Sequence, residues 1–191
     1  LDVASPKPLV LFAAGTAPLT LSFKAAPATF SFDGTASMSE NAYFDGQAKF
    51  SAPSLRRVLE WAQAGNAPGA AIGSVSISSK VTATAGRVKF DNTAISLDNN
   101  PGMGALDLSL GEAQPVISGT LAFDTLDLRS FLSAFTPLAP AAGGGPAEID
   151  TSFADRINLD LRLSAAHATA GTIQLADVAA TAQVKDGLSV F

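Results

Sequence analysis

The sequence contains no cysteine and a single histidine, His167, among its 191 residues. The absence of cysteine excludes disulfide bonds, thiolate chemistry and zinc sites built from cysteine. One histidine without any cysteine also cannot supply the ligands of a histidine-rich metal centre. The sequence therefore predicts neither a bound metal nor a cofactor.

Charge is also scarce, because charged residues make up only 15% of the chain and the net charge is −5. Binding to nucleic acid needs clustered positive charge, so nucleic acid is not an expected partner.

No segment approaches the roughly 20 apolar residues of a membrane-spanning helix. The chain starts at Leu1 without methionine and ends at Phe191 within an alternating segment. We therefore expect both ends to be boundaries within a longer protein.

The sequence does contain a repeated alternation of apolar and polar residues. Leu19, Leu21 and Phe23 alternate with polar residues, and the segments 106–110 and 157–163 show the same pattern. Such alternation predicts strands with one apolar face, whereas a parallel sheet buried on both sides would show continuous apolar runs. We therefore expect a mostly β, largely antiparallel fold. Asn99–Gly102 is predicted to be a turn, and Phe32–Gly34 and Phe44–Gly46 are predicted to be bends.

Two short amphipathic helices are predicted, at Pro53–Ala64 and at about Leu128–Phe135, with Ser51 or Ser54 capping the first. Helices this short cannot cover about ten strands. The apolar face must therefore pack on itself as a sandwich or form a curved, trough-like sheet. A trough would leave an apolar groove, and a large exposed apolar surface usually marks a binding site.

Parts of the chain recur. Leu55 aligns with Leu128, and the Ala-Thr-Ala-Gly sequence at 83–86 reappears at 168–171. A low-complexity run at 136–147 accounts for the difference between the two offsets. We interpret the chain as a single β-rich domain, 1–191. Its internal strand–helix–hairpin repeats lie at about 42–110 and 115–191, and 136–147 is a flexible insertion.

Several short blocks follow one another between about Phe44 and the end of the chain. They are Pro53–Trp61, Gly104–Leu108, Gly119–Leu121 with Leu126–Leu128, Asp160–Ala165, and Asp186–Gly187. In this order they resemble the C-terminal region of the AsmA family of bacterial envelope proteins. The resemblance implies a periplasmic domain of a protein anchored in the inner membrane through a segment outside this chain. It also implies a role in outer-membrane biogenesis, and larger relatives are thought to carry phospholipid along an apolar β-groove.

The function expected from alternation and resemblance together is non-enzymatic binding or guiding of lipid acyl chains. The partner would be phospholipid, and the expected lining residues are Phe90, Leu106, Leu108, Leu121, Phe123, Leu159, Leu161 and Leu175. The same residues could instead form an ordinary sandwich core. A second hypothesis is a scaffold module that docks envelope proteins along an exposed strand edge.

Polar candidates for catalysis or metal binding are weak. His167 aligns with Thr82 in the repeat, and the Gly-x-Ser-x-Gly motif of a serine hydrolase is absent. The carboxylates Asp33, Asp107, Asp127 and Asp160 are expected on polar faces or helix caps. We therefore predict no catalytic residue and no enzyme activity.

Three further features have structural interpretations. Asp98–Asn100 lacks the later glycine and glutamate of a calcium-binding loop and is predicted to be a turn. Gly143–Gly145 lacks the following lysine of a phosphate-binding loop, so we interpret it as part of the flexible insertion. Trp61 is expected to pack the end of the first helix onto the sheet, with contact to lipid as the alternative.

Overall fold

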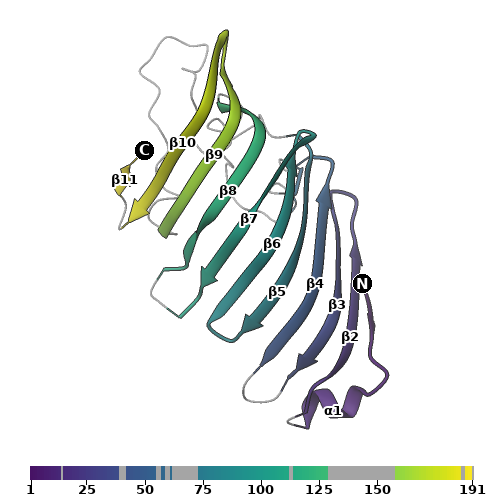
Figure 1. Cartoon of the computed structure of the whole chain (residues 1–191). Coiled ribbons are helices and arrows are strands. Elements are labelled where there is room, and N and C mark those ends of the chain that lie inside the picture. The colour runs from purple at the N-terminus through teal and green to yellow at the C-terminus, as the bar shows by residue number, and fades with distance from the viewer. Residues whose placement is uncertain are drawn as a thin grey trace.

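The computed structural model describes residues 1–13, 15–38, 42–54, 57–58, 61, 73–111, 114–128, 158–185 and 188–190. In these ranges the chain forms one open, eleven-stranded sheet in which spatial order follows sequence order (Figure 1). The strands are β1 Asp2–Ala4, β2 Ala17–Lys24, β3 Thr29–Ser37, β4 Tyr43–Ala52, β5 Val75–Thr84, β6 Arg87–Leu97, β7 Asn100–Ser109, β8 Val116–Asp127, β9 Asn158–Ala170, β10 Ile173–Lys185 and β11 Leu188–Val190. The expected mostly β fold is confirmed, and the described strands form one curved sheet rather than a sandwich of two.

Neighbouring strands are antiparallel throughout, with one exception. β8 and β9 are parallel, and Val116 lies opposite Asn158 while Asp127 lies opposite Thr169. In the first predicted repeat, by contrast, the corresponding strands β4 and β5 are antiparallel. The repeat boundaries 42–110 and 115–191 stay a prediction.

The register places apolar residues of successive strands directly opposite one another, in rows that cross the sheet. One such row runs through Leu19, Gly34, Gly46, Val81, Phe90, Leu106, Gly119, Leu161 and Ala182. Because side chains alternate between the two sides of a strand, each row lies on one side of the sheet. We call the side that carries these rows the apolar face and the other side the polar face.

A β-bulge keeps β6 in phase with its neighbours. Val88 and Phe90 lie on the apolar face at its start, and Thr93 and Ile95 lie there after Asn92, whose φ is +49°. An extra residue in one strand lets the alternation change in this way. The Oγ atoms of the buried Ser79 and Thr93 lie 2.8 Å apart, so the hydroxyl groups at the bulge satisfy one another.

The amino-terminal segment is more regular than its prolines suggest. Pro6 and Pro8 would interrupt a ladder of strand hydrogen bonds, yet the structure has β1 and a helix, α1, at Pro8–Phe12. Proline suits the first turn of a helix because its missing N–H has no partner there in any case. Leu11 is buried in the core of the first strands, and its carbonyl accepts a hydrogen bond from the N–H of Met38 at 2.7 Å.

The start of the first predicted helix is confirmed. Ser54 Oγ accepts the N–H of Arg57 at 3.5 Å, and the carbonyl of Ser54 accepts the N–H of Val58 at 3.3 Å, so Ser54 is the cap. The Trp61 ring lies 5.9 Å from that of Phe23, as expected for packing onto the sheet. The rest of 53–64, the predicted helix beyond Leu128, the insertion 136–147 and Gly143–Gly145 lie outside the described residues.

The predicted bends at Phe32–Gly34 and Phe44–Gly46 are wrong. Both segments lie within strands, and Gly34 and Gly46 are directly opposite one another in β3 and β4. A Cβ atom on Gly34 would lie 2.6 Å from Gly46 Cα and closer still to the carbonyl oxygen of Asp45. The glycines therefore allow a close approach of two backbones and do not form a turn.

Replacing Gly34 tests this close approach. Gly34→Ala is expected to lower the free energy of unfolding by about 1–3 kcal/mol, because the added methyl group meets backbone atoms that cannot rotate away. Urea unfolding would measure the change. The matched control is Gly86→Ala in the β5–β6 turn, where a Cβ atom would meet no atom within 4 Å. Equal unfolding midpoints for the two variants would contradict the close packing of β3 on β4.

Candidate functional site: the apolar face

The structure places every predicted lining residue on the apolar face, on consecutive strands from β6 to β10. Leu108 and Leu159 share a row with Val88 and Ile117, while Phe90, Leu106 and Leu161 share the next row. Leu121 and Phe123 lie in the following two rows, opposite Gly104 and Gly102. Leu175 pairs with the buried Ala168, beyond the point where Asp177 adopts a φ of +51°.

Burial divides these residues into two groups. Leu121, Phe123 and Leu161 are only 4–9% exposed, so they are part of the sheet's own core. Phe90, Leu106, Leu108 and Leu159 are half-buried, and Leu175 is exposed. Only the second group offers apolar surface to a ligand without displacement of the core.

Glycines on β7 and β8 explain how large side chains become buried on an open sheet. A Cβ atom on Gly102 would lie 2.5 Å from the ring of Phe123, and one on Gly119 would lie 2.8 Å from Leu106 Cδ2. Large side chains therefore lie over the glycines of the neighbouring strand. Leu121 lies over Gly104 in the same way. This arrangement buries apolar surface within a single layer.

The apolar face extends further than the sequence-based list. Leu19, Phe32 and Val81 form a buried cluster on β2, β3 and β5, and Phe90 packs against it. The rings of Phe32 and Phe44 meet edge to face, with centroids 6.2 Å apart. The sequence-based lining omits these residues, although Phe30 and Phe32 alternate with Ser31 and Asp33 in the same way as the predicted lining residues alternate with polar ones.

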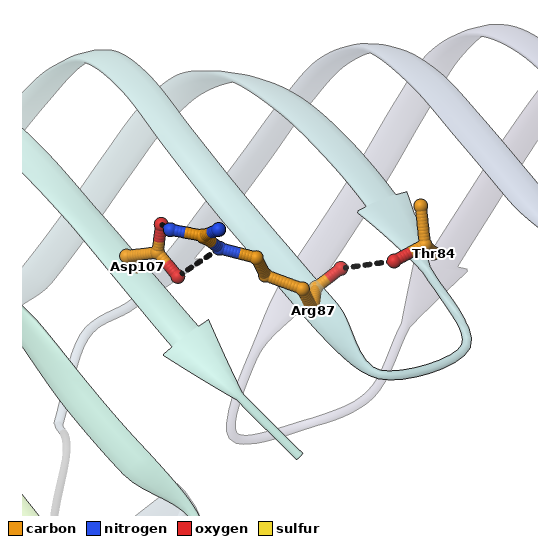
Figure 2. A network of polar contacts seen from close by, with 3 residues as sticks. All are labelled: Thr84, Arg87 and Asp107. Carbon is orange, nitrogen blue, oxygen red and sulfur yellow. Dashed lines mark hydrogen bonds and ion pairs between the residues drawn. The ribbon is translucent and has the colours of Figure 1, made fainter. Parts of the chain in front are cut away.

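The polar face carries separate pairs of charged groups. Figure 2 shows Arg87, at the start of β6, reaching across to Asp107 on β7. Arg87 Nε lies 2.8 Å from Asp107 Oδ1, and Nη2 lies 2.6 Å from Oδ2. Thr84 Oγ1 donates to the carbonyl of Arg87 at 3.3 Å across the turn. The hydrogen bonds from Arg87 lower the pKa of Asp107 against the opposing effect of desolvation, and this pair ties β6 to β7.

The other predicted carboxylates are spread over the sheet. Asp33 is exposed on β3, and Asp127 is the last residue of β8. Asp107 and Asp160 share a row with Ser118 between them, but Asp107 is held by Arg87 and Asp160 accepts a hydrogen bond from Gln183 at 3.4 Å. His167 is exposed.

The segment considered as a possible calcium loop is a hairpin turn. Asp98 and Asn99 have φ values of +50° and +65°, and they join β6 to β7, because Leu97 pairs with Asn100. Positive φ at both central residues is typical of the type I′ hairpin turn. The turn Leu97–Asn100 agrees with the turn predicted at Asp98–Asn100 and lies two residues before the one predicted at Asn99–Gly102, since Asn100–Gly102 begin β7. The Asp98 carboxylate accepts the N–H groups of Gly73 and Ser74 at 3.2 and 2.8 Å, which ties the start of β5 to this turn.

The ion pair between Arg87 and Asp107 makes stability depend on pH. Because the pKa of Asp107 is lowered in the folded state, the pair stabilises the fold above the usual pKa of 3.8. This contribution is lost as the pH falls through the lowered value. In Asp107→Asn, the free energy of unfolding should therefore fall less steeply with acid below about pH 4. Thermal unfolding of both proteins at several pH values between about pH 2 and pH 7 would measure this dependence of stability on pH. Asp33→Asn is the control, and an Asp107→Asn profile parallel to the wild type would contradict the assignment.

Within the described ranges, no group of three or more acidic or histidine side chains could hold a metal ion. No helix in this part of the chain is long and apolar enough to cross a membrane. No family model, no curated protein and no solved structure matches this chain.

Proposed function

We propose that this chain is an AsmA-like periplasmic domain of an inner-membrane-anchored protein that acts in outer-membrane biogenesis. It binds or guides the acyl chains of phospholipids along its apolar face and catalyses no reaction. The observation that supports this proposal is the apolar face that runs from β2 to β10. It presents the half-buried side chains of Phe90 on β6, Leu106 and Leu108 on β7, and Leu159 on β9.

Contact with these side chains suits an acyl chain. The row Val88, Leu108, Ile117 and Leu159 crosses β6 to β9, a distance of about 14 Å at the usual spacing of strands. Each methylene group buried against this surface contributes about 0.8 kcal/mol. Apolar contact has no directional requirement, so a chain can shift along the face without breaking hydrogen bonds.

A scaffold role is the second candidate, because the sheet formed by the described strands does not close. β1 and β11 lie at its two edges, and β1 pairs with β2 only from Thr20 to Ser22. An exposed strand edge can add a strand from another protein. In that case the apolar face would be core alone, and a partner protein rather than lipid would accompany the purified chain.

Native mass spectrometry of the gently purified protein separates the two candidates. We expect adducts with the mass of a phospholipid, and solvent extraction should release the same lipid. A protein that carries no lipid and remains bound to a partner protein would favour the scaffold.

Photo-crosslinking locates the lipid on the sheet. A photoreactive phenylalanine analogue at Phe90 should crosslink to acyl chains, because this half-buried side chain lies on the apolar face. The same analogue at Lys89, the neighbouring exposed residue whose side chain points to the polar face, is the matched control. Crosslinking of lipid at both positions, or at neither, would contradict binding on the apolar face.

A further inference from the structure

α1 carries apolar side chains that the sheet does not bury. Leu9 is 83% exposed and Phe12 is 69% exposed, and Met38, whose N–H bonds to α1, is 41% exposed. We call Leu9, Phe12 and Met38 the α1 tip. Figure 1 shows α1 at the ends of β2 and β3, beside the sheet. The α1 tip is therefore an outward-facing apolar surface at one corner of the fold.

The orientation of α1 is fixed by its opposite side. Leu11 is 4% exposed and packs in the cluster that contains Leu19 and Ala36, and Val10 packs against the same cluster. Leu9 and Phe12 are three residues apart and share one side of the helix. Leu9 lies two residues before Leu11 and therefore about 200° around the helix axis from it. Burial of Leu11 thus forces Leu9 outward.

The size and charge of the α1 tip indicate what it contacts. Three side chains provide far less than the roughly 800 Å² per partner of a stable protein–protein interface. Membrane surfaces, by contrast, accept small apolar wedges, particularly where a basic residue lies beside them. Lys7 directly precedes α1 and is exposed, although the chain as a whole has a net charge of −5.

We propose that the α1 tip inserts into the surface of a lipid bilayer, with Lys7 attracted to anionic headgroups. Because Val10 and Leu11 belong to the cluster of the first strands, insertion would bring this corner of the apolar face to the membrane. The docking itself does not depend on acyl-chain binding. If the proposed function also holds, the corner is where lipid would pass between membrane and sheet.

Flotation with vesicles of phosphatidylethanolamine and phosphatidylglycerol tests the docking. The wild-type protein should float with the vesicles, and Leu9→Ser combined with Phe12→Ser should weaken this binding about tenfold or more. Lys7→Gln should weaken binding to these vesicles and not to vesicles of phosphatidylcholine alone. The matched control combines Met103→Ser and Ile173→Ser, which remove apolar side chains that are 70% and 60% exposed elsewhere. This control should bind like the wild type.

A second measurement does not depend on the stability of the double variant. Leu9→Trp in a Trp61→Phe background should show a blue shift of tryptophan fluorescence when vesicles are added. Failure of the wild type to float, equal binding by the α1 variant, or no blue shift would each overturn the proposal. Dimers that the α1 variant abolishes would also overturn it, because the tip would then bind a second copy. Phospholipid adducts should persist in the α1 variant, so loss of docking and loss of acyl-chain binding remain distinguishable.

Discussion

The rest of the structure depends on backbone pairing between strands that follow one another in the chain. In the described ranges each strand from β2 to β10 pairs with its predecessor and its successor, and the sheet remains open at the edge strands β1 and β11. An open sheet gives every strand a partner but provides no second layer against which to bury side chains. Apolar residues must therefore be shielded within the layer itself. The side chains of Leu106, Leu121 and Phe123, which lie over glycines of the adjacent strand, show how this is done.

This way of burying side chains requires an exact register. A shift of one residue would turn every side chain of a strand to the other face. The sheet meets the requirement with local departures from regular geometry. The bulge at Asn92 moves the apolar positions of β6 by one residue, and Asp177 adopts a positive φ where the apolar positions of β10 change from Leu175 to Val178. Asn and Asp adopt positive φ more readily than most residues, which explains their presence at these points.

The sequence predicts the strands well because alternation is a local property, and it places Phe90 and Leu161 on one face for the same reason. It does not predict that β8 and β9 are parallel, because no local pattern records the direction in which a distant strand returns. The sequence pattern does not reveal α1 either, because a helix of five residues is too short to show a helical period, although Pro8 occupies a favourable first helical position. The segments that end at Gly34 and Gly46 were predicted to be bends because glycine is common in turns. Glycine is equally suited to a close approach of two strands, so its presence alone does not distinguish a turn from a strand.

Burial decides which part of the apolar face can act as a binding surface, and alternation alone cannot reveal it. Leu121, Phe123 and Leu161 have almost no surface left to offer, whereas Leu108 and Leu159 in a neighbouring row remain half-buried.

The buried hydroxyl groups of Ser79 and Thr93 on this face are occupied by each other and by backbone carbonyls. They leave no directional contact for a polar headgroup at that point. If the proposed lipid binding holds, such a surface would favour non-polar ligands and discriminate little among them, because the strength of contact follows buried area rather than the pattern of hydrogen bonds. Selection between lipids would then depend on the polar groups at the rim of the face, where headgroups remain in water.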